Sequence, residues 1–209
     1  MKRFFLASVF LLLGCILAPC QSRLVPRMGS NLDNYRAKLD EVLIVHPYYA
    51  FAVIIMPSFY PESCLYYANE SGELVYRKVK KPVWSYDARF RSPSVKEFRL
   101  SISSESGKKL SDLIDAAVYS SSFLADNRGF DGTIYEFRLM NDLYAATCWS
   151  PFEESNCFKL VNLLERLCKV VSSNDQKMLE ALIPEVEVLT DDFKALFPPE
   201  LEEMPWWIW

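Results

Sequence analysis

The stretch of sequence that decides the fold is Thr133-Ile-Tyr-Glu-Phe-Arg-Leu-Met140, then Asn141-Asp142, then Leu143-Tyr-Ala-Ala-Thr-Cys148. The outer two pieces are rich in β-branched and aromatic residues, and Asn-Asp between them is typical of a tight turn. This pattern predicts a β-hairpin. Because a hairpin pairs its strands antiparallel, the sheet that contains it is expected to be antiparallel.

Outward from the hairpin, both strands and helices are predicted. Strands are expected at residues 49–56, 64–68, 74–79 and 95–103, the first of them buried on both faces. Apolar stripes predict helices at residues 32–45, from Ser106 onward, from Ser150 to Ser172, and at 175–197 with a kink or break at Pro184. Since hairpin-type connections dominate, residues 31–209 are expected to form one α+β domain, an antiparallel sheet with helices packed on one face.

The N-terminus has the pattern of an export signal. Lys2-Arg3 precedes an apolar run at residues 4–13, which is too short to span a bilayer. The run ends in Leu12-Leu13-Gly14-Cys15, which resembles the bacterial lipobox except that Leu13 stands where Ala or Ser is preferred. We therefore expect a signal peptide at residues 1–20 with lipidation at Cys15, and a tether at 21–30. The alternative is a simple secretory signal cleaved after Cys20 or Ser22.

The charge and composition of the chain argue against nucleic acid and against phosphate groups as ligands. The formal net charge is −4, which argues against nucleic acid as a partner. The chain has 6 glycines, so glycine-rich phosphate loops are not expected. The one basic cluster, Arg77, Lys78, Lys80 and Lys81, lies on an alternating strand and is interpreted as a solvated strand face rather than a phosphate site.

Residues able to carry chemistry are few. His46 is the single histidine and precedes a proline, so a helix-capping role is favoured over catalysis or metal binding. Ser106 and Lys109 have Ser-x-x-Lys spacing, but helix capping by Ser106 is the stronger interpretation. Carboxylates at Asp87, Asp126, Asp131, Glu136, Glu153 and Glu154 are expected to be solvated. No catalytic residue, metal or cofactor is therefore predicted.

Four cysteines lie in the predicted domain: Cys64, Cys148, Cys157 and Cys168. In an exported protein they permit disulfides. Cys157 and Cys168 lie too far apart along one helix to bond, whereas Cys148 and Cys157 can pair if residues in the 150s are looped. The alternative is that all four are buried as small apolar side chains.

Aromatic residues are the candidate binding groups. Trp84, Tyr86 and Phe90 cluster with Phe98 around a polar stretch, and Trp206, Trp207 and Trp209 end the chain. Exposed rings offer a large contact area at small entropic cost, as in carbohydrate and peptide binders. The competing interpretation of the C-terminal tail is packing on the core or placement at a membrane interface.

The pieces Phe130-Asp-Gly-Thr-Ile-Tyr-Glu-Phe137 and Cys148-Trp-Ser-Pro151 resemble a pattern in uncharacterised exported proteins and lipoproteins of Bacteroidetes. The resemblance covers the last third of the chain. It implies a place in the envelope of a Gram-negative bacterium (outer membrane, periplasm or cell surface) and no particular activity.

Together these features predict a lipid-anchored, non-enzymatic binding or assembly domain, attached to a membrane through its lipid. Its protein or glycan ligand is not specified by the sequence. Two alternatives remain open: a secreted hydrolase acting through carboxylates, and an inhibitor or immunity-like protein of an envelope enzyme. Facing carboxylates across a deep pocket would favour the hydrolase.

Overall fold

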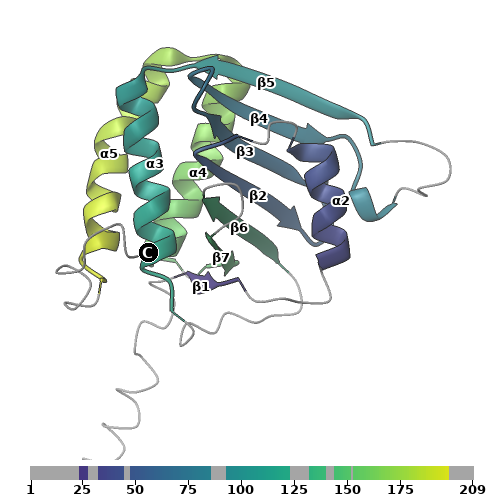
Figure 1. Cartoon of the computed structure of the whole chain (residues 1–209), viewed down its shortest axis with the longest axis horizontal. Helices are drawn as coiled ribbons and strands as arrows, with labels where there is room; N and C mark the ends of the chain where they lie inside the picture. Colours follow the sequence, from purple (N-terminus) through teal and green to yellow (C-terminus); the bar gives the residue numbers. More distant parts are fainter. Residues whose placement is uncertain are drawn as a thin grey trace, which may run out of the picture.

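The computed structural model describes residues 24–27, 33–44, 48–85, 93–122, 132–139, 144–151 and 153–197. Within them, seven strands form one antiparallel sheet in the order β1-β7-β6-β2-β3-β4-β5 (Figure 1). The strands are β1 (Val25–Pro26), β2 (Phe51–Pro57), β3 (Ser63–Ala68), β4 (Glu73–Val79), β5 (Val95–Ser101), β6 (Thr133–Leu139) and β7 (Tyr144–Trp149).

The helices lie on both faces of the sheet. Three of them, α3 (Ser104–Tyr119), α4 (Asn156–Ser173) and α5 (Gln176–Lys194), cover one face, hereafter the helix face (Figure 1). The fourth, α2 (Asp33–Leu43), packs on the opposite face, hereafter the α2 face, together with the 3-10 helix η1 (Val83–Ser85). The predicted α+β class and antiparallel sheet are confirmed, and α2 adds a layer beyond the single helical face that was expected.

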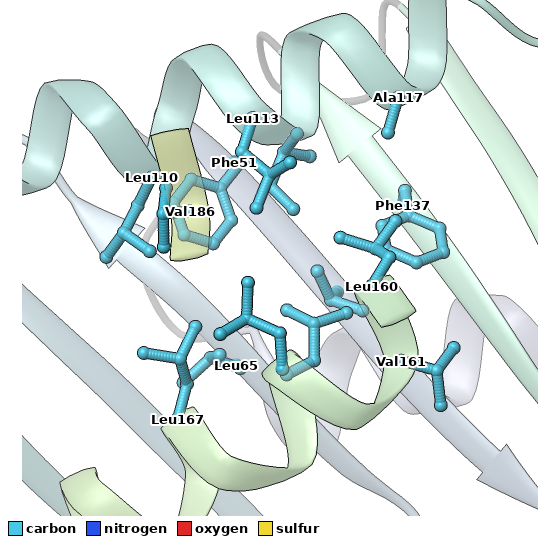
Figure 2. Packing of buried hydrophobic residues seen from close by; sticks show 14 of the residues in the cluster. Phe51, Leu65, Leu110, Leu113, Ala117, Phe137, Leu160, Val161, Leu167 and Val186 are labelled. Carbon is cyan, nitrogen blue, oxygen red and sulfur yellow. The ribbon is translucent and has the colours of Figure 1, made fainter. Parts of the chain in front are cut away.

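The main core lies between the sheet and the three helices of the helix face. Strand β2 is central, since it pairs with both β3 and β6, and its Phe51 and Val53 point into this core. Figure 2 shows Phe51, Leu65 and Phe137 of the sheet facing Leu113 of α3 and Leu160 of α4. The two strands predicted at residues 133–148 pair antiparallel as β6 and β7, and alternate residues such as Tyr135 and Phe137 lie in this core.

Gly107 is required where α3 crosses the sheet. A Cβ atom at this position would lie 2.3 Å from the ring of Tyr67, which is itself buried. The close approach of helix and strand therefore depends on the missing side chain.

The α2 face combines a smaller apolar cluster with a buried ionic network. Leu39 and Leu43 of α2 pack on Ile54 and Tyr66. Beside them, Glu136 of β6 is 0% exposed. The prediction that Glu136 is solvated is therefore wrong, because α2 covers the face of β6 on which Glu136 lies.

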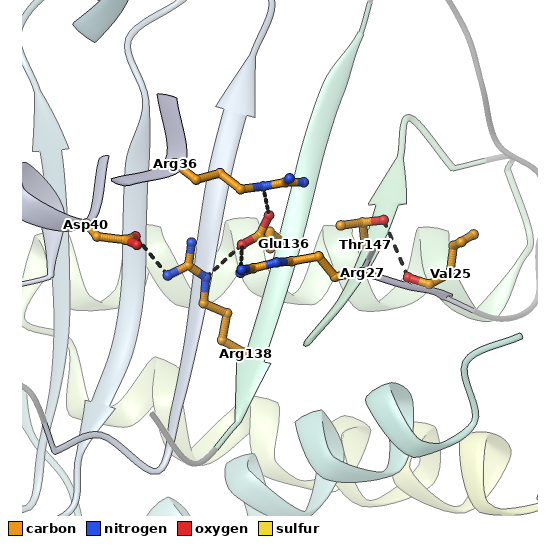
Figure 3. A network of polar contacts seen from close by, with 7 residues as sticks. All are labelled: Val25, Arg27, Arg36, Asp40, Glu136, Arg138 and Thr147. Atoms are coloured by element: carbon orange, nitrogen blue, oxygen red, sulfur yellow. Dashed lines mark hydrogen bonds and ion pairs between the residues drawn. The ribbon is translucent and has the colours of Figure 1, made fainter. Parts of the chain in front are cut away.

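Three arginines surround Glu136 (Figure 3). Its carboxylate accepts from Arg27 Nη1 at 3.0 Å, Arg36 Nε at 2.5 Å and Arg138 Nε at 2.7 Å. Arg138 Nη1 in turn donates to Asp40 Oδ1 of α2 at 2.8 Å. A buried carboxylate is tolerated when cations and donors surround it, so this network joins α2 and the N-terminal segment to the sheet.

Part of the predicted tether belongs to the sheet. Within residues 21–30, Val25 and Pro26 pair with β7, Arg27 N donates to Ala145 O at 2.8 Å, and Leu24 is fully buried. For residues 24–27 the tether prediction is therefore wrong, because a buried leucine and the Arg27–Glu136 ion pair hold this segment on the domain. The rest of that range lies outside the described residues.

Two helix starts differ from the predictions. Helix α4 begins at Asn156, where the side chain of Ser155 accepts from Phe158 N, whereas Ser150 has a positive φ of 31° and cannot start a helix. Helix α3 is capped by Ser103 rather than Ser106.

The predicted break at Pro184 is absent, since α5 continues through it from Gln176 to Lys194. Leu182 and Val186 are buried on either side of the proline, so packing on the neighbouring helices keeps the segment helical. No helix within the described residues is long and apolar enough to cross a membrane.

Candidate functional site

Three adjoining hollows lie on the helix face of the sheet, and each of them is lined in part by residues of α4. Their volumes are about 240, 480 and 610 Å³. The first two share Glu165, and the second and third share Tyr76, Lys78 and Ser172. The three hollows therefore adjoin one another, and together they are here called the cross-sheet groove, which extends from β6 and β7 to the edge strand β5.

The floor of the groove near the sheet edge is aromatic and basic. Tyr76 of β4 and Phe98 of β5 stack with ring centroids 6.0 Å apart. Lys96 Nζ lies 4.6 Å from the Phe98 ring centroid. Lys78 and Lys96 are directly opposite each other in the β4–β5 register, and both are exposed. Strand alternation brings these residues to one face, because Tyr76 pairs with Phe98 and Lys78 with Lys96.

Helix α4 forms the wall of the groove. Glu165, Cys168, Lys169 and Ser172 of α4 line it at helical spacing. Tyr135 of β6 donates its hydroxyl to Glu165 Oε1 at 3.0 Å. Burial raises the pKa of the Tyr135 phenol, and the neighbouring Glu165 carboxylate raises it further, so the phenol stays protonated and donates.

The loop between β2 and β3 forms an aromatic rim. Tyr60, which is 72% exposed, lines the groove, and Phe59 beside it is 69% exposed. The base of this loop is held by Ser58, whose N–H and hydroxyl both donate to Gly132 O, at 2.9 and 2.8 Å. Two exposed rings are thus presented on an anchored turn.

The Gly132-Thr133 and Trp149-Ser150 segments meet at this anchor. Thr133 N donates to Ser150 Oγ, and Ser150 N donates to Thr133 O, both at 3.0 Å. A Cβ atom at position 132 would lie 2.2 Å from Ser150 Oγ, and Gly132 has a φ of 156°. The Gly-Thr and Trp-Ser pieces therefore have a structural role, because they hold the ends of β6 and β7 beside the loop that carries Tyr60.

Lysines and arginines are used differently in the described part of the chain. Every arginine there pairs with a carboxylate: Arg27, Arg36 and Arg138 with Glu136, Arg77 and Arg99 with Glu97, and Arg166 with Glu185. The four lysines of the groove, Lys78, Lys80, Lys96 and Lys169, have no described carboxylate within ion-pair distance. The groove therefore presents positive charge that no described side chain neutralises.

The predicted solvated basic strand is only partly confirmed. Lys78 and Lys80 are exposed, but they line the cross-sheet groove. Arg77 is only 9% exposed and turns to the α2 face, where its side chain donates to Leu43 O at 3.4 Å.

The described lining residues of the groove argue against catalysis by carboxylates. Glu165 is the one carboxylate among its described lining residues, and a glycosidase needs two that face each other. Among the described residues no cluster of histidine, cysteine and carboxylate side chains is placed to hold a metal ion.

Most of the predicted binding residues fall elsewhere. Trp84 is 63% exposed on η1, which packs on the α2 face and not at the groove. The remaining candidates and the single histidine lie outside the described residues: Cys15, His46, Tyr86, Phe90, Trp206, Trp207 and Trp209.

The two candidate disulfide cysteines are neighbours. Residues 153–155 form a loop before α4, which brings Cys157 to the end of β7, where its side chain is hydrogen-bonded to that of Cys148. This hydrogen bond, together with burial, raises the pKa of the Cys157 thiol. Both cysteines are buried and reduced in the structure, as are Cys64 and Cys168.

The residues of the cross-sheet groove that the sequence did not single out include Tyr60, Lys96, Glu165 and Lys169. One signal was present: Lys96 and Phe98 have the spacing that places residues on one face of a strand. Comparison with protein-family models, curated proteins and solved structures gives no significant match.

Proposed function

We propose that the chain is an exported cell-envelope protein, anchored to a membrane by a lipid on Cys15, whose folded domain binds a ligand in the cross-sheet groove without converting it. The observation that carries the binding role is the set of unneutralised lysines beside aromatic rings in a concave surface. A solvated surface has no need to align such groups, whereas a ligand site combines apolar contact with a few directed polar groups. The single lining carboxylate argues against hydrolysis.

The anchor is proposed from the N-terminal sequence, where Gly14-Cys15 follows the apolar run. Two acyl chains on a cysteine hold a protein on a bilayer far more firmly than one. The first described residue after the signal, Leu24, is already part of the domain. A lipid on Cys15 would therefore leave a short connection, and the domain would stay close to the membrane surface.

Expression in a Gram-negative host tests the anchor. The wild-type protein is expected in the membrane fraction with the mass of a chain that starts at an acylated Cys15. Cys15→Ser is expected to abolish the acyl mass and the membrane attachment. Cys20→Ser is the matched control, because it removes a thiol from the same segment and should leave both unchanged. Equal behaviour of the two variants would contradict the anchor.

A thermal-shift screen against envelope components tests the binding role. A groove ligand is expected to raise the Tm of the wild type and not that of Lys78→Gln/Lys96→Gln. Lys38→Gln/Lys177→Gln is the matched control, because it removes two exposed charges on α2 and α5 that do not line the groove. If no component distinguishes the two double variants, the proposed binding site is wrong.

A further inference from the structure

The like-charge pair in the floor of the groove indicates the charge of the ligand. Lys78 and Lys96 face each other across neighbouring strands on the groove side. Like charges directly opposite in a sheet destabilise it, and an ammonium group can donate hydrogen bonds but not accept them. The groove therefore suits a ligand that brings anionic acceptors, and Lys80 and Lys169 extend the same preference along it.

The rings of the groove indicate a ligand with apolar faces as well. Tyr60 projects from the rim, and Phe98 and Tyr76 stack in the floor. Flat rings offer a large contact area to the faces of sugar rings, whose hydroxyls remain at the edges. Hydroxyl groups of Ser172 and Ser173 also line the groove and can pair with such hydroxyls.

The course of the groove argues against an extended peptide. It crosses β2, β3 and β4, and each of these strands pairs on both sides, so their backbone groups are already satisfied. A peptide lying along the groove would run across these strands and not parallel to the edge strand β5, so it could not form the backbone ladder that is the usual source of affinity in strand addition. A sugar chain carries its own donors and acceptors on every unit and has no such requirement.

The length of the groove indicates an oligomer. From β6 to β5 there are four strand spacings in the sheet order, which at ~4.8 Å each gives a span of roughly 19 Å. Such a span accommodates several sugar units in a row, and the lysines are concentrated toward the β4–β5 end.

We infer that the ligand of the cross-sheet groove is an acidic polysaccharide, whose anionic groups pair with Lys78, Lys96 and Lys169 while its sugar rings pack on Tyr60 and Phe98. This inference rests on the proposed binding function and specifies its ligand class.

Titration calorimetry on the full mature chain tests the ligand class. The probes are acidic oligosaccharides carrying carboxylate, sulfate or phosphate groups, with oligogalacturonate and its neutral methyl ester as a matched pair. At least one acidic probe is expected to bind, and its affinity is expected to fall as salt is raised. Within a matched pair, the neutral form should bind about tenfold or more weakly, because charge-assisted hydrogen bonds are lost.

Variants locate the binding. Lys78→Gln/Lys96→Gln is expected to lower the affinity for the acidic probe about tenfold or more. Lys38→Gln/Lys177→Gln is expected to leave this affinity unchanged. Equal affinity for acidic and neutral probes, or tighter groove binding of poly-L-glutamate or of anionic vesicles, would overturn the polysaccharide inference and leave groove binding standing. If no acidic probe binds and the thermal-shift screen also finds no groove ligand, both the inference and the proposed function fail.

Discussion

The two faces of the sheet hold positive charge in opposite ways. On the α2 face, Arg27, Arg36 and Arg138 converge on the buried carboxylate of Glu136. On the helix face, the lysines of the cross-sheet groove are exposed, and none of them is within ion-pair distance of a described carboxylate.

This difference separates charge that stabilises the fold from charge available to a ligand. A planar guanidinium suits buried, geometrically defined pairing, whereas a lysine ammonium at the surface remains hydrated and can exchange water for an anionic partner. Substitutions on the α2 face are therefore expected to change stability, and substitutions in the groove to change binding.

Removing the central carboxylate should have the largest effect. Glu136→Gln leaves three arginines without their shared partner in a buried site, and breaking such a network costs about 3–5 kcal/mol. Urea unfolding followed by circular dichroism measures this loss. Glu165→Gln is the control, because Glu165 is an exposed carboxylate, and it is expected to cost under about 1 kcal/mol. Equal losses would contradict a structural role for the network.

Oxidation of the cysteine pair on the helix face should be the next largest effect. During refolding, glutathione disulfide is expected to take two electrons and two protons from Cys148 and Cys157, releasing two glutathione thiols and forming one protein disulfide. Closing this short loop should raise the free energy of unfolding by roughly 2–3 kcal/mol. Peptide mass mapping and urea unfolding measure both results. Cys148→Ala should abolish the disulfide and Cys64→Ala should not. A different pairing would contradict the expected geometry.

Asp115 on α3 should make stability depend on pH. Burial, with a smaller effect of Asp112, raises the pKa of Asp115 from 3.8 to about 6. Between these values the folded state holds a proton that the unfolded state has released, so this contribution to stability is complete below pH 3.8 and is lost as the pH rises through about 6.

Asp115→Asn should therefore stabilise the protein at pH 7 by roughly 1 kcal/mol, a figure reduced for partial solvent exposure, and should flatten the profile from pH 4 to 7. Urea unfolding across this range measures the change. Asp192→Asn is the control, because it removes a carboxylate that forms a surface ion pair with Lys159, and it should leave the profile in place. An unchanged profile in Asp115→Asn would show that this carboxyl titrates normally.

Reversing one charge in the groove should give the smallest change in stability. Lys96→Glu replaces a like-charge pair with an opposite-charge pair across β4 and β5, which is expected to stabilise the sheet by about 0.5 kcal/mol. The change should be measurable by urea unfolding at low salt. Lys78→Glu/Lys96→Glu restores like charges and should remove the gain. A loss of stability in the single variant would show that the two lysines do not repel each other.

Local sequence patterns predicted much of the sheet, because a strand that is buried on one face alternates apolar and polar residues with a period of two. A strand was predicted at residues 95–103, and in β5 Phe98 and Leu100 lie on the helix face while Val95 lies on the α2 face. The same rule failed for Glu136, which alternates with buried Tyr135 and Phe137 and so resembles a solvent-facing residue. Its burial depends on α2, which precedes it by about a hundred residues, and no local pattern contains that information.

The groove could not be predicted from the sequence for a related reason. Lys78 and Lys96 become neighbours only through the β4–β5 register, which a one-residue shift would change. Glu165 and Lys169 join them only because α4 packs across this part of the sheet. The proximity of Cys148 and Cys157, although not a disulfide between them, could be anticipated from the sequence, since few residues separate the two cysteines.

The most direct test measures stability and ligand affinity together in two variants, Glu136→Gln and Lys96→Gln. The ligand is the acidic oligosaccharide that the wild type binds best, and affinity is determined under conditions in which each variant is folded. We predict that Glu136→Gln loses several kcal/mol of stability with unchanged affinity, and that Lys96→Gln loses affinity about tenfold with unchanged stability. If both variants changed the same quantity, or if Lys96→Gln bound the ligand as the wild type does, the division of charge between fold and groove would be wrong.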